Sequence, residues 1–230
     1  MSSIADNIGS VTRRIQKATL QAGREPGAVH LLAVSKTRPP EDLRETFAAG
    51  QHAFGENYLQ EALEKIEALS DLDGLEWHFI GPIQSNKTRD IAAHFDWVHT
   101  VDRAKVARRL NEQRPDHLPP LNVCIQVNVD DEASKSGVAL DQVEALAAGF
   151  ADWPRLRLRG LMAIPRADNT DGNRAAFRQL AMTLSQLRNT MPGLDTLSMG
   201  MSADYAVAIE EGATVIRLGT ALFGPRLPKA

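Results

Sequence analysis

Short apolar runs alternate along the whole chain with segments whose hydrophobic residues recur at helical spacing. The first helical segment places Ile4, Ile8, Val11 and Ile15 on one face, and glycine and proline within 23–27 end it. Eight apolar runs then predict strands, at 29–34, 52–54, 76–80, 97–100, 123–129, 159–164, 196–199 and 214–218. A helical segment follows each of the first seven runs, so the chain repeats a strand–helix unit.

Eight strands that alternate with helices predict an α/β fold, a single (β/α)₈ barrel preceded by an extra N-terminal helix. No linker or low-complexity segment interrupts the pattern, so residues 1–230 are expected to form one domain. The competing fold is an open Rossmann-like sheet. It is disfavoured because no G-x-G-x-x-G motif follows the first predicted strand.

Composition excludes several classes of protein. Apolar residues make up 43% and charged residues 24% of the 230 residues, which is near the globular average and unlike disordered or coiled-coil chains. The net charge of −3 argues against nucleic acid or a membrane as the main partner. No apolar stretch is long enough to span a bilayer and no signal segment is present, so a cytoplasmic protein is expected. A lone cysteine, Cys124, and histidines without ligand spacing predict neither a disulfide nor a metal site.

Polar residues stand where predicted strands end, which is where barrels carry their functional groups. Lys36 closes the first apolar strand. At a desolvated barrel mouth the pKa of a lysine falls, and its neutral amine can then attack an aldehyde. Lys36 is therefore a candidate to form a Schiff base, although a solvated lysine at a strand end fits the same pattern.

The loops after the last two strands resemble phosphate-binding loops. Gly200 and Ser202 follow the seventh strand, and Gly219 and Thr220 follow the eighth. Ser202 is predicted to cap a helix that begins at Ala203, whose free N–H groups would attract an anion. Simple turns and simple capping are the alternative for each loop, and two adjacent loops together favour phosphate.

Other polar residues leave two interpretations open. Arg217 shares a strand face with Val215 and is expected to point into the barrel, where it would pair with a carboxylate or donate to a ligand. His78 fits either a hydrogen-bonded core histidine or a ligand contact. Lys135, in a polar loop, is an auxiliary anion-binding candidate or a solvated residue. The even-numbered residues 122–128 give the fifth strand a polar face that would line a wet interior.

Seven short motifs together make the sequence recognisable: AVSK (33–36), FGENY (54–58), WHFIG (77–81), SKSG (134–137), RGLM (159–162), LSMGMSAD (197–204) and VIRLGT (215–220). Over residues 29–226 the chain resembles the pyridoxal phosphate homeostasis protein family, whose members are single-domain relatives of the alanine racemase N-terminal barrel.

The resemblance implies a role for each candidate residue. Lys36 would hold pyridoxal 5′-phosphate (PLP) as a Schiff base, the internal aldimine. The phosphate would lie against Ser202, Gly219 and Thr220. Arg217 would face the pyridine nitrogen, and Asn57 would contact the side of the ring. The remaining residues would line the pocket, namely His78, Ile80, Met162 and Met201.

The function that the resemblance implies is intracellular PLP homeostasis, in which a monomeric carrier holds the cofactor and delivers it to apo-enzymes without substrate turnover. An arginine at the pyridine nitrogen weakens PLP as an electron sink. The chain also ends soon after the eighth strand, which leaves no room for the carboxyl-terminal domain whose tyrosine is the second base of alanine racemases. The alternatives are a PLP-dependent amino-acid racemase or related small enzyme, and a Schiff-base aldolase on the same barrel.

Overall fold

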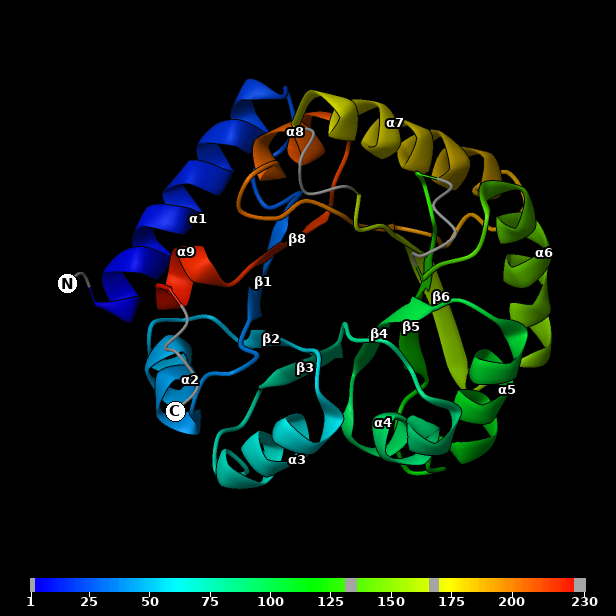
Figure 1. Cartoon of the computed structure of the whole chain (residues 1–230), viewed down its shortest axis with the longest axis horizontal. Coiled ribbons are helices and arrows are strands. Elements are labelled where there is room, and N and C mark those ends of the chain that lie inside the picture. Colours follow the sequence, from blue (N-terminus) through cyan, green and yellow to red (C-terminus); the bar gives the residue numbers. More distant parts are fainter. Residues whose placement is uncertain (1–2, 131–135, 166–169, 226–230) are drawn as a thin grey trace.

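Eight parallel strands form a closed barrel in chain order, and helices surround it (Figure 1). The computed structural model describes residues 3–130, 136–165 and 170–225. Each strand pairs with its neighbour in the sequence, and β8 pairs with β1 to close the ring. The predicted (β/α)₈ barrel is therefore confirmed, and the open sheet is excluded.

The strands are short and lie close to the apolar runs of the sequence. They are β1 (His30–Val34), β2 (Ala53–Glu56), β3 (Glu76–Phe79), β4 (Trp97–Val101), β5 (Leu121–Gln126), β6 (Leu156–Met162), β7 (Thr196–Ser198) and β8 (Val215–Leu218). The α-helices are α1 (Ile4–Gln21), α2 (Pro40–Ala48), α3 (Leu59–Ala68), α4 (Thr88–His94), α5 (Ala104–Gln113), α6 (Val143–Ala148), α7 (Thr170–Leu187), α8 (Tyr205–Glu210) and α9 (Thr220–Phe223). Within the described residues the short 3₁₀ helices are η1 (Ser85–Lys87), η2 (Leu140–Gln142) and η3 (Gly149–Asp152).

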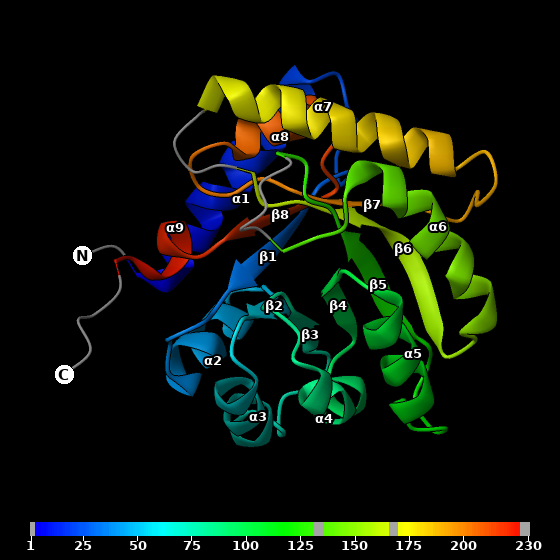
Figure 2. The same cartoon turned by 45° about the vertical axis from the view of Figure 1, so that its right-hand side comes forward.

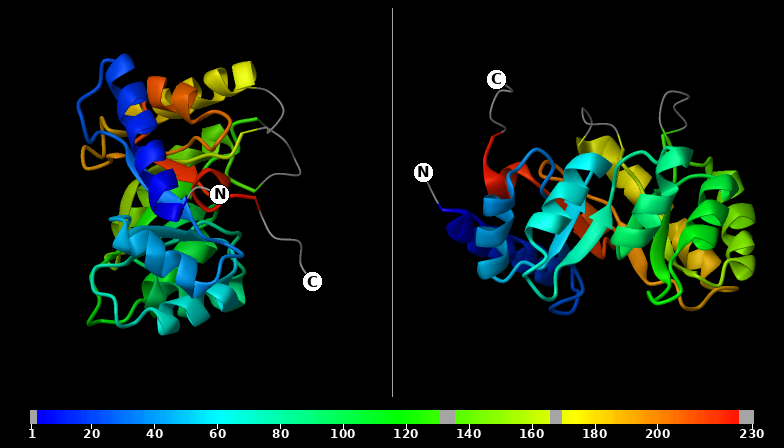
Figure 3. Two further views of the ribbon diagram at one scale, coloured as in Figure 1. Left: turned by 90° about the vertical axis from the view of Figure 1, so that its left-hand side faces the viewer. Right: turned by 90° about the horizontal axis from the view of Figure 1, so that it is seen from below.

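The extra N-terminal helix completes the outer ring. The backbone N–H of Asp6 donates to the Ser3 hydroxyl and the Ser3 N–H donates to the Asp6 carboxylate, a capping box that starts α1. Its apolar face is buried, and α1 contacts α2, α8 and α9. The left view of Figure 3 shows blue α1 against red α9, and in Figure 2 yellow α7 runs beside α8. Among the described helices, none has the length and apolar character to cross a membrane.

Strand parity divides the side chains into two sets. One set faces the helices and forms the main core, with Phe54, Val98 and Ile216 fully buried there. The other set fills the barrel, where two small apolar clusters lie. The first cluster contains Leu32, Ile80 and Val215, and the second contains Trp97, Cys124 and Met162.

The polar face of the fifth strand points into the barrel as predicted, but Cys124 at the centre of that face has no contact with solvent. Cys124 is wholly buried against Trp97 and Met162, so the prediction of a wet interior is wrong at this level. The physical reason is that large side chains from neighbouring strands occupy the space that water would need.

Candidate functional site

A cavity of about 190 Å³ opens among the loops at the carboxyl ends of the strands. Its lining side chains come from the ends of β1, β2, β3, β6, β7 and β8. These lining residues are Val34, Lys36, Arg38, Asn57, Ile80, Ile164, Met201, Ser202, Arg217, Gly219 and Thr220. The structure therefore brings most of the predicted site residues to one place, although they span almost the whole sequence.

Two of the predicted lining residues lie elsewhere. His78 is hydrogen-bonded in the barrel interior and borders a second cavity, and Met162 is fully buried against Trp97 and Cys124. The reason is strand geometry, because His78 precedes Ile80 by two residues and so lies roughly 6–7 Å deeper along the same face. Lys135 lies outside the described residues.

Sequence reasoning missed three lining residues, Val34, Arg38 and Ile164. Val34 has the same strand parity as Lys36, so alternation contained the signal for it. Arg38 follows Lys36 in the same loop, and its guanidinium donates to the backbone oxygens of Gly224 and Pro225. Arg38 therefore joins the loop after β1 to the end of α9 and adds a cation to the cavity.

The turn that carries Lys36 is anchored by three buried or half-buried charged groups, Glu56, Glu61 and Lys65, which we call the turn clamp. Lys65 is 2% exposed. Its Nζ donates to Glu56 Oε1 at 2.7 Å, to Glu61 Oε1 at 2.5 Å and to the backbone oxygen of Ser35 at 2.7 Å. Burial raises the pKa of the Glu56 carboxyl, and the neighbouring Lys65 opposes that rise.

The turn clamp forms hydrogen bonds with the residues on both sides of Lys36. The Ser35 hydroxyl donates to Glu56 Oε1 at 2.6 Å, and the Thr37 backbone N–H donates to Glu61 Oε1 at 2.5 Å. Thr37 has a φ of 64°, a left-handed conformation that a β-branched residue adopts only at a cost. These contacts hold the Lys36 backbone in place at the mouth of the cavity.

Arg217 brings a buried positive charge to the cavity. It is 4% exposed, and its guanidinium donates to Ser198 Oγ and to the Ala163 backbone oxygen, both at 2.8 Å. Burial lowers the pKa of Arg217 to about 10, which leaves it cationic near neutral pH. Among the described residues its hydrogen-bond acceptors are uncharged oxygens, and the nearby Asp204 carboxylate acts on it through charge alone.

The predicted phosphate loops have a different local geometry from the one expected. Helix α8 begins at Tyr205, and the residue at its N-cap is Asp204. Its carboxylate accepts from the Met201 backbone N–H at 2.7 Å, so the prediction that Ser202 caps this helix is wrong. The backbone N–H groups of Asp204 and Tyr205, which a Ser202 cap would need, donate to the Met201 backbone oxygen, and Ser202 is left exposed at the cavity.

The loop after β8 comes close to β1. A Cβ atom on Gly219 would lie 3.0 Å from the Val34 backbone oxygen, so only glycine fits there without a shift. Thr220 is exposed beside it. Asn57 also lines the cavity, and its Oδ1 is buried without a hydrogen-bond partner among the described residues. A ligand that hydrogen-bonds Asn57 would remove a desolvation cost of about 1–3 kcal/mol.

The cavity combines an amine with cations and hydroxyl groups. Lys36, Arg38 and Arg217 line it, and no carboxylate does so among the described residues. The chain has a net charge of −3, so this is a local anion-binding environment. The arrangement can bind a small phosphorylated compound and present an amine to its aldehyde.

The sequence matches a known class of protein domain. Residues 7–227 match the family described as "Alanine racemase, N-terminal domain". A Pseudomonas aeruginosa protein named "Pyridoxal phosphate homeostasis protein" is 60% identical over 98% of this chain and 97% of its own length. A relative of the same name from Escherichia coli K12 is 52% identical, with 98% of each chain covered.

A solved structure gives the same result. PipY of Synechococcus elongatus PCC7942, with PLP bound, is 37% identical with a TM-score of 0.83, and the match covers 96% of this chain and 100% of that one. The chain thus belongs to the family of pyridoxal phosphate homeostasis proteins, within the alanine racemase N-terminal class. The resemblance inferred from the sequence motifs is confirmed.

Proposed function

We propose that this chain binds PLP covalently at Lys36 and serves PLP homeostasis by holding the cofactor and passing it to apo-enzymes, without turning over a substrate. The observation that carries the proposal is that Lys36, Arg217 and the hydroxyls of Ser202 and Thr220 line one small cavity. When bound, PLP supplies an aldehyde that condenses with an amine and releases water.

The lining residues would complement the phosphate, the pyridine nitrogen and the ring of PLP. Ser202, Gly219 and Thr220 would hold the phosphate, because hydroxyls and a close backbone approach favour a compact anion. Arg217 would face the pyridine nitrogen, and Asn57 would donate or accept at the side of the ring. The apolar side chains of Ile80 and Met201 would pack against the ring itself.

The names of the relatives support the proposed role. The P. aeruginosa and E. coli proteins are named for PLP homeostasis, and the PipY structure has PLP bound. Because these similarities cover nearly the whole chain, the same cofactor is proposed here.

The chemistry of the lining supports binding without turnover. Racemisation needs a second acid or base, and the described lining residues include no carboxylate, histidine, cysteine or tyrosine. Neither of the chain's two tyrosines, Tyr58 and Tyr205, is a lining residue. A cationic Arg217 at the pyridine nitrogen would also disfavour ring protonation and with it carbanion chemistry.

The covalent step is tested by the absorption spectrum of the protein with added PLP, followed by borohydride reduction and peptide mapping. We expect one adduct, at Lys36, which Lys36→Ala abolishes. Lys87→Ala removes an exposed lysine of η1 outside the cavity and should leave the adduct intact. An adduct spread over surface lysines would contradict the proposal.

Turnover and delivery need separate assays. The PLP-loaded protein should restore activity to an apo-PLP enzyme, and it should neither racemise nor transaminate amino acids. Steady racemisation that Lys36→Ala abolishes would establish the enzymatic alternative instead.

A further inference from the structure

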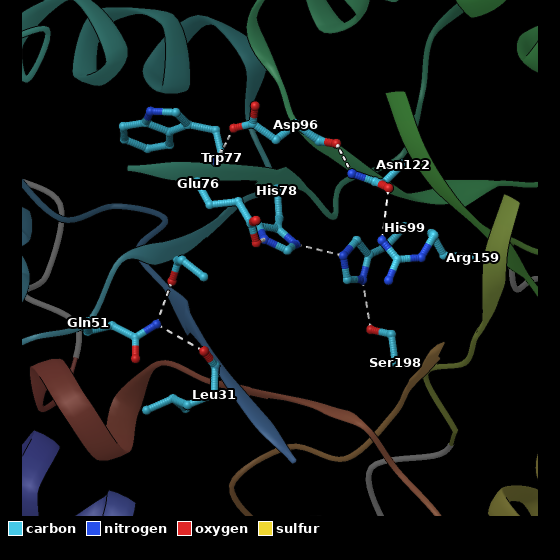
Figure 4. Close-up of polar contacts among 11 residues, drawn as sticks. Leu31, Gln51, Glu76, Trp77, His78, Asp96, His99, Asn122, Arg159 and Ser198 are labelled. Carbon is cyan, nitrogen blue, oxygen red and sulfur yellow. Dashed lines mark hydrogen bonds and ion pairs between the residues drawn. The ribbon is translucent and has the colours of Figure 1, made fainter. Parts of the chain in front are cut away.

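A continuous chain of hydrogen bonds crosses the barrel interior, from the cavity to the opposite end. Arg217 Nη1 lies 2.8 Å from Ser198 Oγ, which lies 2.7 Å from His99 Nδ1. His99 Nε2 lies 2.9 Å from His78 Nδ1, and His78 Nε2 lies 2.6 Å from Glu76 Oε1. We call these five residues the interior relay, and Figure 4 shows the part from Glu76 to Ser198.

The direction of every hydrogen bond in the interior relay follows from its two ends. The hydrogen bond from His78 lowers the pKa of the Glu76 carboxyl, and an ionised Glu76 only accepts, so His78 Nε2 donates. Burial holds the pKa of His99 well below its usual range, and its Nδ1 faces the Ser198 hydroxyl, so its one ring proton is on Nε2 and is donated to His78 Nδ1. His99 Nδ1 in turn accepts from the Ser198 hydroxyl, whose oxygen accepts from Arg217.

The surroundings leave these groups little freedom. His99 and Ser198 are fully buried, and His78 and Arg217 are each 4% exposed. The His78 ring stacks on Trp97 with centroids 5.4 Å apart and an interplanar angle of 5°. A buried polar chain of this kind is stable only when each member is paired, so removing one link penalises its neighbours.

The far end of the interior relay reaches solvent. Glu76 has a side chain 48% exposed, and it lines a second cavity of about 830 Å³ at the amino-terminal end of the barrel. In the same cavity Arg159 lies over the Trp97 ring and is paired with Asp195. The interior relay therefore joins two cavities through an otherwise dry core.

We propose that Ser198, His99 and His78 are positioning residues for Arg217, and that through them the cofactor cavity is coupled to Glu76 at the opposite end of the barrel. The proposal rests on the proposed function in one respect, that Arg217 faces bound PLP. The physical basis is that the Arg217 guanidinium donates to Ser198 Oγ as well as to the Ala163 backbone oxygen. The hydrogen bond between Ser198 and His99 fixes the direction of the lone pairs on Ser198 Oγ.

The first test uses the PLP-free protein and is independent of the proposed function. ¹⁵N NMR of the histidine rings, assigned with His→Gln variants, should find a proton on Nε2 and none on Nδ1 in both rings. Ser198→Ala should shift the Arg217 Nε–Hε resonance, and Thr196→Val should not. Thr196 has the same inward parity on β7, but its hydroxyl donates to Asp195. A proton on Nδ1 of either ring, or no Arg217 shift, would overturn the proposal.

The second test measures PLP affinity and the spectrum of bound PLP. Ser198→Ala should weaken binding about tenfold and change the pH dependence of the absorption band, whereas Thr196→Val should do neither. Because Ser198 is buried, Glu76→Leu provides a second variant at an exposed position. It should weaken binding about threefold. The control Gln16→Leu, at an exposed position in the same second cavity, should not change binding.

The outcomes separate the two proposals. If variants of the interior relay have the same PLP affinity as their controls, the proposed coupling is overturned. If the wild type shows the expected tautomers and Ser198→Ala shifts the Arg217 resonance, but the wild type does not bind PLP, the proposed function is overturned and the positioning of Arg217 remains supported.

Discussion

Lys36 lies in a turn whose backbone is fixed by the contacts of its two neighbours. Ser35 and Thr37 are both tied to the turn clamp, and the clamp residues come from the end of β2 and from α3. A flexible lysine side chain loses much rotamer freedom on binding, so a fixed backbone reduces the entropy that a covalent bond must overcome. The turn clamp is thus a structural requirement of the proposed binding site.

Lys65→Met should destabilise the fold by about 3 to 5 kcal/mol, because it leaves buried Glu56 without its cation. The loss should be larger at high pH than at low pH. The variant raises the folded-state pKa of Glu56 further, so stability is lost as the pH rises and the carboxyl must ionise. Urea unfolding at two pH values measures both effects.

The matched control for this prediction is Arg44→Met. Arg44 forms a bidentate salt bridge with Asp71, but both side chains are exposed. Solvent screens such a pair, so little change is expected. Equal losses for the two variants would contradict the importance assigned to burial.

Thr220→Val tests one phosphate contact. A hydrogen bond to a charged partner contributes about 1.5–3 kcal/mol, so PLP affinity should fall at least about tenfold while the fold stays intact. Thr183→Val on α7 replaces a hydroxyl that donates to the Gln179 backbone oxygen, far from the cavity lining, and serves as the control. Titration of PLP absorbance gives the affinities, and equal affinities in the two variants would remove Thr220 from the site.

At the scale of elements, the site exists because the ends of β2 and β3 come close together. A Cβ atom on Gly81 would lie 2.0 Å from the Asn57 backbone oxygen, a contact that only backbone movement could relieve. The absence of a side chain at Gly81 lets the two loops meet and sets the position of Asn57 at the cavity.

Gly81→Ala should therefore lower the urea midpoint of unfolding and weaken PLP binding together, because the loop after β2 must move. In Gly193→Ala an added Cβ has nothing within 4 Å, so that variant should match the wild type. A stable Gly81→Ala protein with normal PLP affinity would show that the close approach is not needed.

At the scale of the whole molecule, barrel closure produces a dry interior around the chain's one cysteine. Burial raises the pKa of the Cys124 thiol to about 12, so the reactive thiolate is scarce at pH 8. The native protein should not react with Ellman's reagent at that pH on the timescale of minutes, and it should react stoichiometrically in urea. Rapid labelling of the native protein would contradict the closed, packed barrel.

The sequence by itself determined the order and type of the elements. Hydrophobic periodicity reports which face of a segment is buried, and this signal is local, so the strand–helix repeat and the barrel follow from it. It also placed Lys36, Ser202, Gly219 and Thr220 at strand ends. The predicted cap at Ser202 failed, because the backbone N–H groups of Asp204 and Tyr205 donate to the Met201 backbone oxygen, and hydrophobic periodicity does not report such a turn.

Only the tertiary structure decided which side chains meet. The register between strands sets the depth of each inward side chain, and so His78 and Met162 lie outside the cavity, whereas the loop after β1 brings Arg38 to it. The same register joins His99 to Ser198, which is 99 residues away in the sequence. A hydrogen bond across a closed barrel depends on distances that no local pattern encodes, and this is why the interior relay became visible only in the folded chain.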